Sequence, residues 1–212
     1  MDARALYDSV GSEHEFWKGV EEAGRAKVGD APAQLALRKI AKLLDEEGIA
    51  YAVAGALALG QHGYVRATTD VDLLLTREGL AALKLAALGR GWLEKFPGSK
   101  GLRDTDLDVA IDVLIAGDFP GDGKPKPIAF PDPAEVGVRV GGARFLPLGT
   151  LIELKLASGL SAPHRVKDLA DVQELIKAAK LPRELGAELD PSVRAKYDEL
   201  WTAVANSPPD EE

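Results

Sequence analysis

The chain of 212 residues contains no cysteine, which excludes disulfide bonds and any site that needs a thiolate as nucleophile or metal ligand. It has no uncharged apolar run of about eighteen residues, the length of a membrane-spanning helix, so no membrane association is expected. The 34 acidic residues outnumber the 26 basic residues, and the formal net charge is −8. This argues against strong non-specific binding to nucleic acid but leaves room for a local basic groove. The N-terminus lacks a signal-peptide pattern, and a cytoplasmic location is expected.

Several common catalytic motifs are also missing. No phosphate-binding P-loop and no GxSxG nucleophile motif is present. The three histidines, at positions 14, 62 and 164, do not have the spacing of a metal site. The composition is that of an ordinary soluble globular protein, with 46% hydrophobic and 28% charged residues.

Hydrophobic periodicity predicts an α/β (α+β) chain with a mixed β-sheet core flanked by helices, followed by a helical C-terminal portion. We expect an N-terminal helical segment, a core, a C-terminal helical portion and a tail, over residues 1–32, 33–147, 148–206 and 207–212. Helices are expected over 3–28, 33–47, 55–61, 77–90, 148–159, 165–179 and 191–205. Strands are expected over 49–54, 71–75, 92–96, 106–116, 136–140 and 143–147, the last two joined by a Gly-Gly hairpin.

Asp70 and Asp72 are the most informative pair in the sequence. They lie in VRATTDVDLLL, directly before an apolar run. In a strand, residues i and i+2 project from the same face, so both carboxylates would point to one place. Carboxylate oxygens are the ligands that Mg²⁺ prefers, usually one or two together with substrate phosphates. The alternative is a pair of solvated acids on an exposed strand.

A third carboxylate is expected on a neighbouring strand. In the strand predicted over 106–116, Asp106, Asp108 and Asp112 would share one face. Asp112 is the preferred candidate because apolar residues flank it, and Asp108 is the second choice. An exposed face with several acids is the alternative.

Gly55 stands where an apolar strand is expected to turn into a helix. Such a turn leaves backbone N–H groups available for phosphate oxygens, and glycine lets a phosphate approach without a Cβ in the way. By itself this is a weak signal, since most glycines at such turns have only a structural role.

The stretch AVAGALALGQHGYVRATTDVDLLL resembles the first motif of the DNA-polymerase-β-type nucleotidyltransferase superfamily. It is closest to the AbiEii-like branch, whose members include toxins of toxin–antitoxin pairs. The matching residues, in order, are His62-Gly63, Arg66, Thr68, Asp70 and Asp72. A later segment is similar to that branch's downstream motif and contains Lys155 and Arg165-x-Lys167-Asp168-x-x-Asp171. The resemblance covers roughly residues 35–178.

This resemblance implies an enzyme that uses Mg²⁺ or Mn²⁺ to transfer a nucleoside monophosphate from a nucleoside triphosphate (NTP) to a hydroxyl acceptor. Asp70, Asp72 and Asp112 would hold the metal, Lys155 would contact the triphosphate, and Asp168 would position a catalytic or nucleotide group. The implied nucleotide-binding residues are Gly55, Ala56, Arg66, Thr69, Lys155 and Lys167. Ala56 stands where the family usually has Gly or Ser, and alanine cannot offer a hydroxyl group to a phosphate.

Two questions stay open at the level of sequence. The toxin-like resemblance favours tRNA or another RNA as acceptor and allows a cognate antitoxin as partner, whereas the negative net charge favours a protein or a small molecule, including an aminoglycoside. The chain is alternatively a weak or inactive member of the fold that acts through binding. The charges of the downstream motif are alternatively helix-surface charges, with Lys167 and Asp171 as an i,i+4 pair.

Overall fold

The computed structural model describes residues 31–208, which belong to two compact units. The first unit contains residues 31–61, 65–117 and 130–147, and the second contains residues 62–64, 118–129 and 148–208. The helix expected over 3–28 and the end of the tail, residues 209–212, lie outside the described part of the chain.

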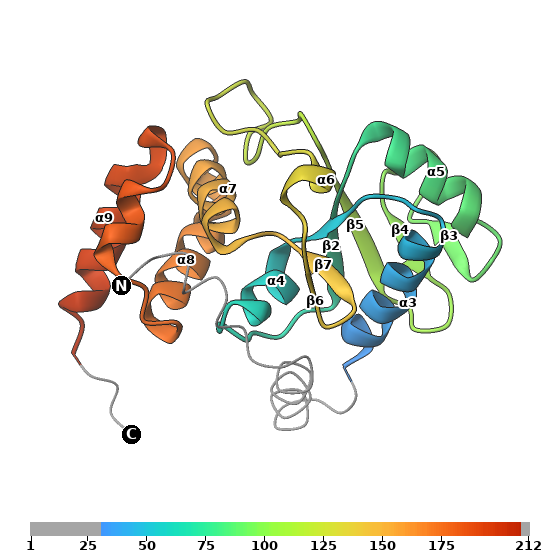
Figure 1. Cartoon of the computed structure of the whole chain (residues 1–212), viewed down its shortest axis with the longest axis horizontal. Coiled ribbons are helices and arrows are strands. Elements are labelled where there is room, and N and C mark those ends of the chain that lie inside the picture. Colours follow the sequence, from blue (N-terminus) through green and yellow to red (C-terminus); the bar gives the residue numbers. More distant parts are fainter. Residues whose placement is uncertain (1–30, 209–212) are drawn as a thin grey trace. The chain divides into compact units, whose positions relative to one another are not determined.

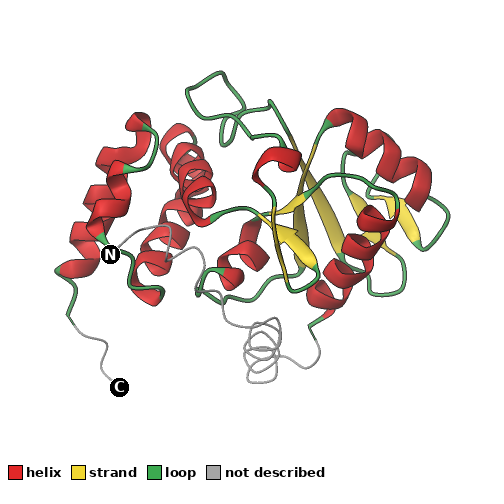
Figure 2. Cartoon of the chain, in the orientation of Figure 1, coloured by secondary structure: helices red, strands yellow, loops and turns green. Residues whose placement is uncertain are grey.

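The first unit is built on a mixed sheet, with helices beside it (Figure 2). The sheet has seven strands in the order β3-β4-β5-β2-β1-β7-β6. The strands are β1 Ala52–Val53, β2 Asp70–Leu75, β3 Trp92–Glu94, β4 Leu102–Asp104, β5 Ala110–Ile115, β6 Val138–Val140 and β7 Ala143–Phe145. At the centre, β2 pairs in parallel with β5 and antiparallel with β1. The expected mixed sheet with flanking helices is confirmed.

Four α-helices belong to the same unit: α3 Pro32–Glu46, α4 Gly55–Gln61, α5 Arg77–Ala87 and α6 Pro133–Val136. Both α3 and α5 contact β2 and each other, and they lie side by side along the sheet (Figure 1). The buried face of α3 includes Ile40 and Leu44, as the apolar spacing predicts, whereas Leu35, also expected in the apolar stripe, is exposed. Gly48, just past the end of α3, has φ +65°, the left-handed conformation of a C′ glycine.

The expected hairpin near residue 141 is confirmed. Strands β6 and β7 pair antiparallel, with Val140 opposite Ala143. Gly141 and Gly142 between them have φ values of +56° and +83°. A two-residue turn with positive φ at both positions matches the twist of the flanking strands, and glycine reaches this conformation without strain.

The prediction of a strand over 106–116 was wrong for residues 106–109. Strand β5 begins only at Ala110, and the preceding segment is a turn that connects it to β4. The Asp104 carboxylate accepts hydrogen bonds from the backbone N–H groups of Asp106, at 2.9 Å, and Leu107, at 3.1 Å. Because these side-chain bonds fold the backbone into a turn, the apolar alternation there does not continue the strand.

The second unit is helical, as expected, with α7 Leu148–Ser161, α8 Val166–Ala178 and α9 Pro191–Ala205, and with two short 3₁₀ helices, Pro163–Arg165 and Arg183–Ala187. The three α-helices all contact one another. Asp190 caps α9 by accepting a hydrogen bond from the backbone N–H of Ser192 at 2.9 Å. Across residues 31–208, none of the helices combines the length and the apolar character needed to cross a membrane.

Candidate functional site

Asp70 and Asp72 lie on the same face of β2. Val71 between them is fully buried, whereas both aspartates are partly exposed. This alternation is the one expected for a strand with one face against the core. The predicted geometry of the pair is therefore confirmed, while its role as a metal site stays a prediction.

Asp112 joins this face through the register of the sheet. It lies on β5 directly beside Asp72 in the parallel pairing of β2 and β5. Neighbouring strands are about 4.8 Å apart, and parallel partners point to the same side of the sheet. Asp108, the second choice, lies before β5, has φ +56° and is paired with Arg103 at 2.5 Å. Asp106 also precedes β5 and is paired with Lys39 at 2.7 Å, so the expectation that all three acids share a face was wrong.

Asp70 and Asp112 are each held by a neighbour from the same unit. The Thr68 hydroxyl donates a hydrogen bond to Oδ1 of Asp70 at 2.5 Å. The Lys95 ammonium group lies 2.6 Å from Oδ1 of Asp112. Within residues 31–208, no three acidic or histidine side chains converge closely enough to hold a metal ion together. In this arrangement the outer carboxylates are engaged by the protein itself.

Gly55 is required by the position of Asp72. Its φ is +59°, and a Cβ atom built on it would lie 1.8 Å from Oδ2 of Asp72. Glycine thus provides room for a carboxylate at the start of α4, a role that its sequence context did not reveal. The next residue, Ala56, is buried. The other predicted nucleotide-binding residues of this unit are Arg66, which is partly buried, and Thr69, which is exposed.

Lys155 and Asp168 meet in the second unit, in a buried cluster between α7 and α8. The Lys155 ammonium group lies 3.1 Å from Oδ1 of Asp168 and 2.7 Å from Oδ2 of Asp171. Oδ2 of Asp168 also accepts hydrogen bonds from the Ser158 hydroxyl at 2.6 Å and from Nε of Arg165 at 2.8 Å. Burial raises the pKa of Asp168, but the charge of Lys155, the Ser158 hydrogen bond and Arg165 outweigh it, and the net pKa lies below its ordinary value.

The alternative of helix-surface charges was wrong for three residues of the downstream motif. Lys155, Asp168 and Asp171 are all buried, whereas Lys167 is exposed. The sequence motif contained only part of the buried cluster, because Ser158 is not in it. The available signal for Ser158 was its position three residues after Lys155, since such residues lie on one face of a helix.

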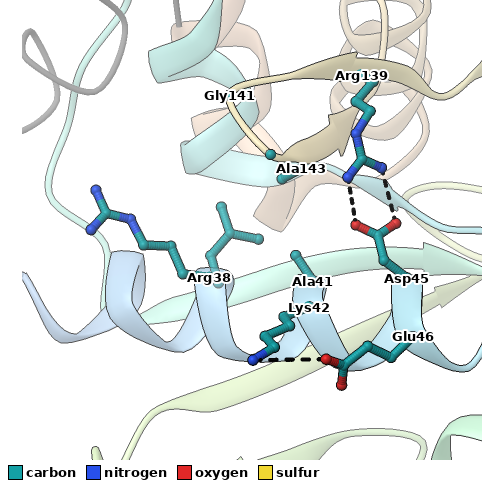
Figure 3. A pocket seen from close by; sticks show the side chains of 10 residues that line it. Arg38, Ala41, Lys42, Asp45, Glu46, Arg139, Gly141 and Ala143 are labelled. Carbon is teal, nitrogen blue, oxygen red and sulfur yellow. Dashed lines mark hydrogen bonds and ion pairs between the residues drawn. The ribbon is translucent and has the colours of Figure 1, made fainter. Parts of the chain in front are cut away.

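A pocket of about 740 Å³ lies elsewhere in the first unit, between α3 and the β6–β7 hairpin (Figure 3). Arg139 and Asp45 both line it, and Arg139 donates two hydrogen bonds to Asp45, at 3.1 and 2.9 Å. The Lys42 ammonium group lies 3.7 Å from the Glu46 carboxylate. None of the predicted site residues lines the pocket. Four of its charged groups pair with each other, Arg139 with Asp45 and Lys42 with Glu46. The candidate site therefore stays at the carboxylates.

No protein-family model matches the chain. Among curated proteins, it is 32% identical over 124 residues to the tryptophan synthase beta chain of Streptomyces coelicolor, which is 56% of this chain and 26% of that protein. The chain thus spans about a quarter of the length of the curated relative that it matches.

Among solved structures, the chain is similar to ANT(2″)-Ia in complex with adenylyl-2″-tobramycin, with 19% identity, 81% of this chain and 95% of that chain covered, and a TM-score of 0.48. A solution structure of the antibiotic-resistance factor ANT(2″)-Ia gives 19% identity, coverages of 82% and 92%, and a TM-score of 0.49. JHP933 from Helicobacter pylori gives 15% identity, coverages of 81% and 90%, and a TM-score of 0.45.

Proposed function

We propose that this chain is a metal-dependent nucleotidyltransferase. The observation that carries the proposal is the carboxylate face: Asp70 and Asp72 on β2, with Asp112 beside Asp72 on β5. Asp72 and Asp112 are register partners on adjacent strands. Like charges opposite each other destabilise a sheet, and a bound divalent cation would offset this repulsion. The sequence resemblance supports the same conclusion, because Asp70 and Asp72 end its first motif.

The proposed reaction is the attack of an acceptor hydroxyl oxygen on the α-phosphorus of an NTP. A bond forms between that oxygen and phosphorus, the bond from phosphorus to the bridging oxygen breaks, and pyrophosphate leaves. The hydroxyl proton is lost to a base. Such transfers depend mainly on positioning and on electrostatic stabilisation of the phosphate charge, with little covalent chemistry by the protein.

The residues of the carboxylate face fit a divalent cation. Carboxylate oxygens are hard ligands, and Mg²⁺ or Mn²⁺ is commonly held by one or two of them together with substrate phosphates. Asp70 and Asp72 would supply these ligands, and the space that Gly55 leaves open accommodates the Asp72 carboxylate. When bound, the ion would neutralise charge on the phosphate oxygens. Thr68 orients Asp70 through its hydrogen bond of 2.5 Å.

We keep the roles of the other predicted residues as part of the proposal. Arg66 and Lys167 would contact nucleotide phosphates, and the backbone at Gly55 and Ala56, with Thr69, would line the nucleotide. Lys155 would approach the triphosphate. An ammonium group has three N–H donors, so its bonds to Asp168 and Asp171 are compatible with one further contact to a phosphate oxygen.

Two observations favour different classes of acceptor. The AbiEii-like resemblance favours the 3′ end of tRNA or another RNA, and then a cognate antitoxin as partner. The net charge of −8 instead favours a protein or a small molecule. The experiment therefore offers all three acceptor classes.

The purified chain is incubated with each of the four α-³²P-labelled NTPs and Mg²⁺, and with total tRNA, a protein extract or an aminoglycoside mixture. The test variant is Asp70→Asn/Asp72→Asn. The matched control is Asp108→Asn, because Asp108 is a nearby acid outside the carboxylate face. Label that appears on one acceptor with the wild type and the control, and is lost in the double variant, supports the proposal. Equal labelling by all three proteins refutes it.

A second candidate function is binding without catalysis. It is favoured by Lys95, which occupies Asp112, and by Ala56, which lacks the hydroxyl group of a serine. In that case no acceptor is labelled, calorimetry detects no NTP binding, and the double variant retains the partner captured by the wild type.

A further inference from the structure

One row of residues runs across four neighbouring strands or strand ends on the carboxylate face. Asp72 on β2 is the register partner of Asp112 on β5. Leu102 on β4 pairs antiparallel with Ile111, which brings Gly101 opposite Asp112. The backbone N–H of Lys95, just past β3, donates to the carbonyl of Gly101 at 3.2 Å. The row therefore reads Lys95, Gly101, Asp112, Asp72.

The glycine in this row allows the lysine to reach the aspartate. A Cβ atom at Gly101 would lie 2.8 Å from Cδ of Lys95 and 3.2 Å from Oδ1 of Asp112. Any side chain there would stand in the path of the lysine. Without one, the Lys95 side chain passes over the β4 position and ends 2.6 Å from the Asp112 carboxylate.

The pairing supplies Asp112 with a positive charge from the protein. With Lys95 in this position, no three acids among residues 31–208 converge on one point. The pairing is also open to exchange, because the side chains of Lys95 and Asp112 are 31% and 40% exposed. Ion pairs with this exposure contribute only about 0.2–1 kcal/mol and break easily.

We propose that Lys95 is a built-in competitor of the divalent cation: its ammonium group occupies Asp112 until a metal ion displaces it. This inference rests on the proposed function, since it takes the carboxylate face to be a metal site. Lys95 lies outside the sequence motifs. Without nucleotide, the wild-type protein should bind a divalent metal more weakly than a variant that lacks the Lys95 charge.

Removal of the Lys95 charge should leave the loop from 95 to 101 folded. Lys84 binds Glu94 and the carbonyl of Ser99, each at 2.6 Å. Glu94 in turn accepts a hydrogen bond from the backbone N–H of Gly98 at 2.8 Å. The Ser99 hydroxyl accepts one from the N–H of Gly101 at 3.1 Å. These bonds hold the loop without the Lys95 ammonium group.

The test is a Mn²⁺ titration of the full chain without nucleotide, followed by electron paramagnetic resonance of the free ion. Lys95→Met is compared with the wild type, with Lys95→Arg, which keeps the charge, and with Lys100→Met, which removes the same charge from an exposed position in the same loop. Lys95→Met should bind Mn²⁺ about fivefold more tightly, the upper end of the contribution of one such ion pair. Lys95→Arg and Lys100→Met should stay within about twofold of the wild type, since surface changes elsewhere have small effects.

Unchanged or weaker Mn²⁺ binding by Lys95→Met would overturn the inference, and so would an equal gain in Lys100→Met. The Asp70→Asn/Asp72→Asn variant separates this failure from failure of the proposed function. If that variant binds Mn²⁺ as the wild type does, or if neither the wild type nor Lys95→Met binds it, the carboxylate face is not a metal site and both proposals fail. If the wild type binds and the double variant does not, a null result for Lys95→Met refutes the competitor alone.

Discussion

Replacement of Lys155 by methionine tests how the buried cluster contributes to the second unit. The Lys155 side chain is only 9% exposed, and those of Asp168 and Asp171 are 8% and 3% exposed. Methionine fills most of the same space but leaves two buried carboxylates without their ammonium partner. Removal of one partner from a buried ion pair costs about 3–5 kcal/mol. We expect the lower end, because Asp168 keeps its bonds to Ser158 and Arg165.

The measurement is urea unfolding followed by far-ultraviolet circular dichroism. Lys167→Met is the matched control, since it removes the same charge from an exposed position of α8, and its effect should stay within about 0.5 kcal/mol. The variant Lys155→Met/Asp168→Asn/Asp171→Asn should recover much of the loss, because no buried charge is then unpaired. A cost below about 1 kcal/mol for Lys155→Met would refute the reasoning, since a surface ion pair costs no more than that.

Three further outcomes follow from the same geometry. Asp70→Asn/Asp72→Asn should lower label transfer at least about a hundredfold, because charge stabilisation by a metal is worth several kcal/mol; unchanged thermal unfolding would show that the fold is intact. Gly55→Ala should weaken Mn²⁺ binding about tenfold, as loss of a group that positions a ligand does, and a titration equal to that of the wild type would contradict this role. The pKa of Asp168 is lower in the folded chain, so its stabilisation is present above the unfolded pKa and is lost as pH falls through the folded value. Urea midpoints measured from pH 7 to below about pH 4 should therefore fall more in the wild type than in Asp168→Asn.

The elements that could be predicted from sequence are those whose cause is local. The buried stripe of α3, the glycine that ends it and the Gly-Gly hairpin each depend on residues a few positions apart. The shared face of Asp70 and Asp72 likewise follows from the two-residue period of a strand. The turn before β5 could not be predicted this way, because Leu107 and Val109 continue an apolar alternation. It depends on Asp104, whose carboxylate binds backbone N–H groups that a strand would have used otherwise.

The candidate site contains contacts that no local pattern encodes. Lys95 meets Asp112 only because two strand pairings bring positions 17 residues apart into one row, with a glycine between them. The burial of Lys155 and Asp168 depends in the same way on the packing of α7 against α8. The sequence motifs contained Thr68 and Lys155, which hold Asp70 and Asp168. Lys95 and Ser158 lie outside the motifs, and sequence reasoning missed them.

The charge balance of the carboxylate face then suggests an order of events for the proposed enzyme. The ammonium group of Lys95 supplies a positive charge to this face through Asp112. An ion that takes Asp112 as a ligand would have to displace the lysine. An incoming triphosphate favours that displacement, because its own negative charge offers Lys95 another partner. Lys95→Met should therefore improve metal binding most in the absence of nucleotide, and its advantage over the wild type should shrink when the triphosphate is present.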